Sequence, residues 1–236
     1  MKKNNYFYNL LFVLGCFALS ISSHFYCDFL IQDWFLNSEK NSWIIQTDRD
    51  VYWIIFYQLP KAFFGIVVFC IFIWGMFFSK RGGRFLIVGL MVLASPILVA
   101  YLKSVTGVEC PKDLLDFGGD KHFIPFMQSL FMGSGRCFPG GHVSAGFGLY
   151  PVMALCNEKK RRFAFFLITA LGFSMNIYQL ARGYHFLSHN LFTMGLSFSL
   201  YLLSQYLIER YETGLAHLIL LIQTKLGLKR LTDEPF

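Results

Sequence analysis

Residues 62–103 read AFFGIVVFCIFIWGMFFSKRGGRFLIVGLMVLASPILVAYLK, with two long apolar runs on either side of one short basic turn. Each run approaches the roughly 20 apolar residues that a helix needs to cross the hydrocarbon core of a bilayer. Of the 236 residues in the chain, 55% are hydrophobic and 15% are charged, whereas a soluble domain carries about 25% charged residues. This composition excludes an ordinary soluble enzyme and a disordered segment.

Similar apolar runs elsewhere in the chain predict an all-α polytopic membrane protein with six transmembrane helices in a bundle. We expect a single membrane-embedded domain over residues 1–236. Its last part, 209–236, is a predicted cytoplasmic tail in which apolar residues recur at helical spacing. This tail is interpreted as a helix in the inner interface or a helix packed at the bundle edge. The predicted spans are 7–24, 58–79, 85–103, 142–157, 163–181 and 188–208.

The distribution of basic residues predicts the orientation. With the amino terminus in the cytoplasm, 13 of the 21 Lys and Arg residues lie on the inner side, and eight lie outside or at the outer ends of spans. Since cytoplasmic loops are enriched in Lys and Arg, both termini are predicted to be cytoplasmic. Most of the net charge of +7 is thereby explained without nucleic acid as a partner. The first span lacks a clear signal-peptidase site and is interpreted as a membrane anchor.

On this topology three polar segments meet at the outer face, namely 103–120, 133–142 and 179–190. They hold three of the six histidines and eight of the 20 glycines of the chain, together with the basic residues Lys103, Lys112, Arg136 and Arg182. Ionisable groups at membrane depth are costly, so such a cluster indicates a functional site. The active site is therefore predicted at the outer, periplasmic end of the bundle.

Residues 135–142 read GRCFPGGH and precede an apolar run. Glycines that open a helix leave backbone N–H groups free to approach an anion, and the helix dipole favours negative charge there. Gly140 and Gly141 are therefore candidate phosphate ligands. A tight turn with His142 as a helix cap is the structural alternative.

Residues 178–190 read YQLARGYHFLSHN. In a helix, Arg182, His185 and His189 would share one stripe, offering a cation, a nucleophile or base, and an orienting partner. An interfacial belt, in which these side chains only reach toward lipid headgroups, is the alternative.

Together the three segments resemble the type 2 phosphatidic acid phosphatase family, whose integral-membrane members are six-helix lipid phosphatases. The family signature is Lys-x6-Arg-Pro, then Pro-Ser-Gly-His, then Ser-Arg-x5-His-x3-Asp. The order, the internal spacings and the membrane placement agree over residues 103–189. The retained positions are Lys103, Pro111, Pro139, Gly141, His142 and His185. The replaced positions are Cys110 and Gln179 for the arginines, Gly140 and Tyr178 for the serines, and His189 for the aspartate.

The resemblance implies a reaction that needs no metal or other cofactor. It makes His185 the nucleophile that forms a phosphohistidine, His142 the general acid for the leaving oxygen, and Lys103 a phosphate clamp. Phosphoryl transfer depends on positioning and charge stabilisation, so the missing arginines matter. We interpret Arg182, about one helical turn from His185, and Arg136, six residues before His142, as candidate replacements.

His189 stands where the family has an aspartate that orients the nucleophilic histidine. A neutral imidazole at this position would accept a hydrogen bond from His185 and hold its tautomer. Asp113 and Asp116 are candidates to supply the missing negative charge. Reduced or altered activity is therefore one expectation from the sequence.

Two of the six cysteines, Cys110 and Cys137, lie on the outer side next to the motif prolines. In an oxidising periplasm they would form a disulfide that pins the first motif to the second. Free thiols are one alternative, and a bond to Cys27 is another. The cysteines inside spans are interpreted as small apolar fillers; they are Cys16, Cys70 and Cys156.

The leading hypothesis is a lipid phosphatase or phosphotransferase at the outer leaflet of a bacterial inner membrane. Undecaprenyl pyrophosphate, phosphatidylglycerol phosphate, phosphatidic acid and lipid A are the candidate substrates that the resemblance implies. The five replaced positions motivate a second hypothesis, a lipid-phosphate binding or transport protein that has lost catalysis. A metal-dependent hydrolase using His185 and His189 with His142 or Asp113 is a third hypothesis, and a serine hydrolase using Ser144 and His185 is a fourth.

Overall fold

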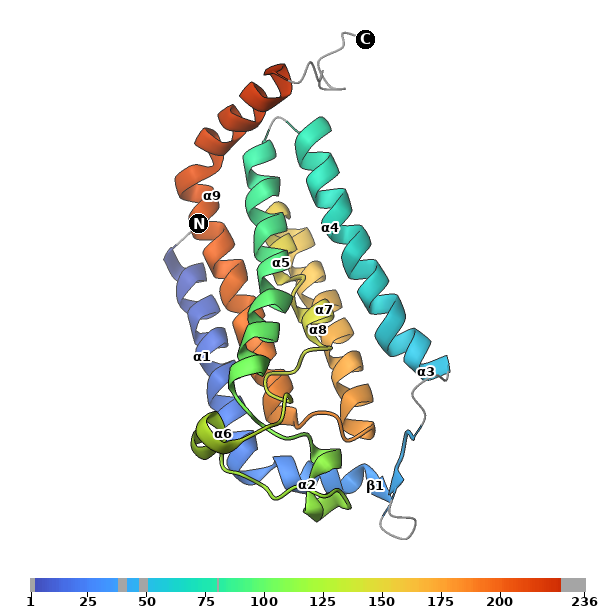
Figure 1. Cartoon of the computed structure of the whole chain (residues 1–236). Helices are drawn as coiled ribbons and strands as arrows, with labels where there is room; N and C mark the ends of the chain where they lie inside the picture. The colour runs from blue at the N-terminus through green and yellow to red at the C-terminus, as the bar shows by residue number, and fades with distance from the viewer. Residues whose placement is uncertain (1–2, 38–41, 47–50, 80, 226–236) are drawn as a thin grey trace.

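The computed structural model describes residues 3–37, 42–46, 51–79 and 81–225. Long helices run side by side and form a bundle (Figure 1). Five of the described helices are long and apolar enough to cross a membrane. The predicted fold class, an all-α polytopic membrane protein, is confirmed. The long helices are α1 (Lys3–Tyr26), α4 (Leu59–Phe77), α5 (Gly82–Val105), α8 (Glu158–Ala181) and α9 (Leu187–Lys225).

The outer faces of these helices are apolar, as contact with lipid requires. Phe69 on α4, Ile97 on α5 and Phe166 on α8 are 66%, 63% and 68% exposed. Between the helices lies an aromatic core that includes Phe147, Tyr150, Phe198 and Tyr201. A hydrogen bond of 2.8 Å between the hydroxyls of Ser95 and Ser197 joins α5 to α9 inside this core.

The helix of the second predicted span begins earlier than expected. A short helix α3 (Val51–Trp53) and a π-helical turn η1 (Ile54–Gln58) precede α4, and the apolar helix covers Val51–Phe77. The π-helical turn carries Tyr57, and Lys61 follows near the start of α4.

The fourth predicted span, 142–157, differs most from expectation. Its apolar part, Ser144–Leu155, is shorter than the five long helices, and consists of α7 (Ser144–Phe147) and a 3-10 helix η4 (Tyr150–Leu155). Most of its residues are buried in the bundle. Gly148 and Pro151 interrupt regular helix formation here, and such a backbone is tolerated at membrane depth because protein surrounds it.

The last helix is longer than predicted. Residues 209–225 of the predicted tail continue α9 without a break, while residues 226–236 lie outside the described part. This extension packs against the start of α5, where Arg84 and Glu212 form a salt bridge of 3.2 Å. The Gln223 side chain also donates a hydrogen bond to the Met76 carbonyl on α4. These contacts pack the extension against the edge of the bundle, while Leu218 and Ile222 remain 50% and 45% exposed, so an interfacial helix stays a prediction.

Short elements cover the end of the bundle where α5 and α8 finish and α9 begins (Figure 1). A two-residue pair of antiparallel strands, β1 (Leu36–Asn37) and β2 (Ser42–Trp43), follows the helix α2. Leu114, Phe117 and Phe186 form a small buried cluster beneath these elements. The remaining elements of this cap are α2 (Asp28–Trp34), η2 (Pro111–Asp113), η3 (Leu115–Phe117) and α6 (Phe126–Met132).

Candidate active site

The three motif segments, which are far apart in the sequence, are hydrogen-bonded to one another. The Lys112 amide of the first segment donates to the Gly183 carbonyl of the third at 2.8 Å. The Gly140 amide of the second donates to the His189 carbonyl of the third at 3.0 Å. The Thr106 hydroxyl donates to the Phe138 carbonyl at 2.6 Å, which joins the end of α5 to the second segment. The motif residues therefore form one site.

A disulfide between Cys110 and Cys137 adds a covalent link between the first and second segments. The S–S distance is 2.24 Å and the Cα atoms are 5.1 Å apart. Cys27, the alternative partner, is a free and exposed thiol. The disulfide places the Cys137 sulfur inside the site, where it is fully buried.

Three histidines gather beside this disulfide. The ring centroids of His142 and His185 are 5.9 Å apart, as are those of His185 and His189. His185 and His189 are buried, at 1% and 2% exposure, and His142 is half-buried. The structure thus brings together the three residues that were predicted to be catalytic.

The helical stripe predicted for the third segment does not form. Helix α8 ends at Ala181 and α9 begins at Leu187, so Arg182 and His185 lie in the turn between them. Gly183 makes this turn with a φ of +66°, and a Cβ on it would lie 2.3 Å from the Trp43 ring. Only glycine combines this backbone conformation with the packing of Trp43.

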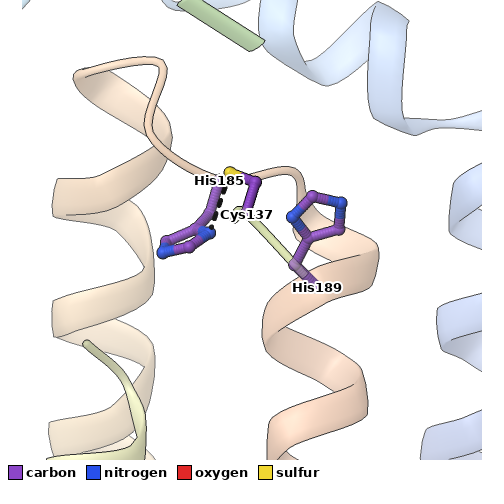
Figure 2. A group of neighbouring side chains, drawn as sticks. All are labelled: Cys137, His185 and His189. Atoms are coloured by element: carbon purple, nitrogen blue, oxygen red, sulfur yellow. Dashed lines mark hydrogen bonds between the residues drawn. The ribbon is translucent and has the colours of Figure 1, made fainter. Parts of the chain in front are cut away.

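His185 contacts the disulfide on its Nδ1 side. Its Nδ1 lies 3.4 Å from Cys137 Sγ, and Figure 2 shows Cys137 between the two imidazoles of His185 and His189. Cys137 therefore takes the position beside Nδ1 at which His189 was expected. Burial lowers the pKa of His185 well below its ordinary value, and the nearby Lys103 charge acts in the same direction. Both effects favour the neutral imidazole.

A basic cavity of about 260 Å³ opens beside His142, between α4 and α5. Lys103, Gly141 and His142 line it together, and so does Lys61. The Lys103 Nζ lies over Gly141, 3.3 Å from the position that a Cβ there would occupy. Burial, followed by the charges of Lys103 and Lys61, lowers the pKa of His142 to about 3. The cavity is suited to an anion, whose charge would offset these lysines.

The other predicted phosphate ligands do not line this cavity. The Gly140 amide is used in its hydrogen bond to His189. Arg136 is exposed in the loop before Cys137. Arg182 is buried, and its guanidinium carbon lies 5.1 Å from the Tyr178 ring centre and 4.2 Å from that of Tyr184.

Cys137, His185 and His189 also form a compact group whose potential metal-ligating atoms all lie within 4.8 Å of one another (Figure 2). Sulfur and imidazole nitrogen are typical zinc ligands. A thiolate is the form of cysteine that binds metal, whereas the Cys137 sulfur is bonded to Cys110. With this disulfide in place the group offers two imidazoles. Asp113, the predicted further ligand, pairs with Lys112 at 3.0 Å instead.

An apolar cavity of about 500 Å³ lies next to His189, between α1 and the segment around α6. Aromatic side chains form much of its wall; they are Phe25, Phe123, Phe126, Phe138, Phe186 and Phe192. The three-histidine group therefore has a basic cavity beside His142 and an apolar cavity beside His189.

Two charged residues at this end of the bundle, Lys61 and Asp28, were not among the predicted site residues. Lys61 is one of the eight basic residues that the predicted topology places outside or at the outer ends of spans, and an ionisable residue near the start of an apolar run is itself a functional signal. Asp28 is buried at 2% exposure and accepts hydrogen bonds from Ser23 and from the Ser188 amide, at 2.7 and 3.0 Å. Nothing in the spacing around Asp28 indicates this contact with α9.

Ser144 was a candidate nucleophile under the serine-hydrolase hypothesis. Its hydroxyl is buried and donates to the Gly141 carbonyl at 2.6 Å. It therefore acts as a local turn-stabilising group, and no contact between Ser144 and His185 is present among the described residues.

Comparison with known proteins identifies a family for the chain. No curated protein and no solved structure matches the chain. The model of the PAP2 superfamily matches residues 84–212, a range that contains all three motif segments and runs from α5 into α9. This match covers more than half of the chain and confirms the resemblance to the type 2 phosphatidic acid phosphatases. The chain therefore belongs to the PAP2 superfamily, whose members are phosphatases that act on phosphate esters.

Proposed function

We propose that the protein is a lipid phosphatase or phosphotransferase that acts through a phosphohistidine on His185. The observation that carries this proposal is the 5.9 Å separation of the His142 and His185 rings beside a lysine-lined cavity. A nucleophile, a proton donor and a phosphate-binding cation are the parts that phosphoryl transfer needs. All three lie at one end of an apolar bundle, where a lipid headgroup would reach them.

His185 is the proposed nucleophile. A disulfide sulfur has no proton to donate, so the contact with Cys137 favours the tautomer that carries its proton on Nδ1. The lone pair is then on Nε2, and burial keeps the ring neutral. In the first step Nε2 forms a bond to phosphorus while the bond from phosphorus to the leaving oxygen breaks.

His142 is the proposed general acid. It must be protonated when the leaving oxygen departs, although burial and the two lysines favour its neutral form in the free protein. A bound phosphate dianion reverses this balance because it places negative charge beside the imidazole. After donating its proton, neutral His142 takes a proton from water, which attacks the phosphohistidine and releases phosphate. With a hydroxyl acceptor in place of water, the same step transfers the phosphoryl group.

For location, we propose a bacterial inner membrane with both termini in the cytoplasm and the active site at the outer leaflet. The 13 to 8 division of basic residues supports this orientation. A lipid whose phosphate is bound between α4 and α5 would keep its alkyl chains in the adjoining hydrocarbon of the bilayer. Undecaprenyl pyrophosphate, phosphatidylglycerol phosphate, phosphatidic acid and lipid A remain the proposed substrates.

The test is phosphate release from these lipids by purified full-length protein in detergent, with and without EDTA. His185→Ala should abolish release and the acid-labile phosphoprotein that the wild type accumulates in a rapid quench. His142→Ala should reduce release by about 100- to 10,000-fold, the usual contribution of general acid catalysis. His122→Ala, at an exposed histidine of the same end, is the matched control and should have no effect.

Normal phosphate release by His185→Ala would contradict the mechanism. Loss of activity in EDTA with restoration by zinc would instead favour the metal-dependent hydrolase, which the compact group of Cys137, His185 and His189 motivates. Binding of lipid phosphate without turnover would favour the non-catalytic binding protein, which the replaced motif residues motivate.

A further inference from the structure

Two lysines from neighbouring helices line the same cavity as His142. Lys61 comes from α4 and Lys103 from α5, and apolar side chains such as Phe64 and Val99 form much of the remaining wall. Among the described residues that line this cavity, none is acidic. Two ammonium groups without a carboxylate in a largely apolar wall repel each other, and a bound anion would relieve this repulsion.

Lys61 is held toward His142 through Tyr57. The Lys61 Nζ lies 3.8 Å from the centre of the Tyr57 ring, and the centres of the Tyr57 and His142 rings are 4.6 Å apart. The Lys61 charge also acts directly on His142. Tyr57 belongs to the π-helical turn η1, a feature that is frequent at functional sites because it changes the direction of side chains within a helix.

The site needs a second cation because the arginines of the family signature are missing. Cys110 replaces one and is bonded to Cys137. Gln179 replaces the other arginine. It is fully buried, and its side-chain amide has no hydrogen-bond partner among the described residues. Arg136 is exposed and Arg182 lies against two tyrosine rings, so neither lines the cavity.

We propose that Lys61 is a phosphate-binding residue of the active site. Its ammonium group would bind a non-transferred oxygen of the phosphate that Lys103 also holds, and would stabilise negative charge there in the transition state. This inference rests on the proposed function and extends it to a residue outside 84–212, the range that the family model matches. Lys61 is exposed as well as lining the cavity, so it would be able to contact the headgroup of a lipid that enters from the membrane.

The test compares Lys61→Met, Lys61→Arg and the matched control Lys121→Met in the full-length protein in detergent. Lys121 is exposed in the loop at the same end of the bundle and does not line the cavity. The affinity for inorganic phosphate is measured by calorimetry, and kcat/KM by phosphate release. Lys61→Met should weaken phosphate binding by about 10- to 100-fold, the value of a hydrogen bond to a charged group. Lys61→Arg should retain most of the affinity, and Lys121→Met should equal the wild type.

Thermal unfolding of each variant separates loss of binding from loss of fold, because a structural role would move the melting temperature and would not be rescued by arginine. Wild-type phosphate affinity and wild-type kcat/KM in Lys61→Met would overturn the inference and leave the proposed function intact. The opposite outcome has two parts. Loss of phosphate binding in Lys61→Met would support the role of Lys61, and failure of the wild-type protein to cleave any of the lipids would contradict the proposed function.

Discussion

A side chain at residue 140 has no room in this site. A Cβ on Gly140 would lie 2.0 Å from the Asn190 Oδ1. Asn190 is buried and fixed, since its Nδ2 donates to the Asn176 Oδ1 at 2.5 Å. The glycine that replaces the serine of the family signature is therefore matched to an asparagine on α9.

Gly140→Ser is expected to destabilise the protein by about 1–3 kcal/mol, the usual cost of overpacking, and to lower phosphate release. In an Asn190→Ala background the same substitution should cost less, because the colliding oxygen is gone. A double-mutant cycle on thermal unfolding and phosphate release measures this coupling. Equal losses in both backgrounds would show that Asn190 is not the obstacle.

Residues within one motif, and the disulfide that joins two motifs, could be predicted from the sequence, whereas the other contacts between segments could not. Lys103, His142 and His185 were found because each belongs to a motif with its own internal spacing. Lys61 was missed because its role depends on how α4 packs beside α5. Cys137 was predicted as a disulfide cysteine, but its contact with His185 depends on the turn that Gly183 makes.

At the scale of elements, α9 depends on a carboxylate from another helix. Asp28, the first residue of α2, accepts a hydrogen bond from the Ser188 amide at 3.0 Å and also from the Ser188 hydroxyl. Amides in the first turn of a helix have no acceptor within that helix. Asp28 supplies the acceptor for the Ser188 amide, and among the described hydrogen bonds no residue of α9 does so. His185 lies two residues before α9 and His189 lies within its first turn, so we expect Asp28 to help position both.

Asp28→Ala is expected to lower the free energy of unfolding by about 1–3 kcal/mol, because a buried amide and hydroxyl lose their acceptor. Phosphate release should fall with it, as the first turn of α9 is no longer fixed. Asp33→Ala, at an exposed carboxylate of the same short helix, is the control for thermal unfolding and activity. If the two variants behave alike, Asp28 does not hold the site.

At the scale of the whole molecule, the long lipid-facing helices could be predicted because each must satisfy its backbone hydrogen bonds internally over the thickness of the bilayer. The predicted span 85–103 lies within α5, and 163–181 lies within α8. Ser144–Leu155 could not be predicted in the same way. A segment surrounded by protein does not need the roughly 20 residues with which a lipid-facing helix crosses the bilayer. Apolar composition alone does not show whether a segment is surrounded by protein or by lipid.

The orientation of the bundle predicts which loops an impermeant maleimide reaches in intact cells. In a background without the exposed thiols of Cys27 and Cys70, Lys121→Cys should be labelled and Lys159→Cys should be labelled only after permeabilisation. Both positions are exposed and lie at opposite ends of the proposed topology. Labelling of Lys159→Cys alone in intact cells would reverse the assignment.

The shortness of the apolar segment Ser144–Leu155 also affects how the protein is inserted into the membrane. As a regular helix, Ser144–Leu155 would extend about 18 Å, well short of the roughly 30 Å of hydrocarbon, so it is a poor substrate for insertion on its own. Gly146 approaches Gly172 on α8 closely enough that a Cβ on Gly146 would lie 2.8 Å from the Gly172 Cα. The segment would therefore enter the membrane together with α8 as a helical hairpin. His142 would then reach its place only after α8 has been synthesised, and since His185 and His189 follow α8 in the chain, a nascent chain stalled earlier cannot assemble the three-histidine group.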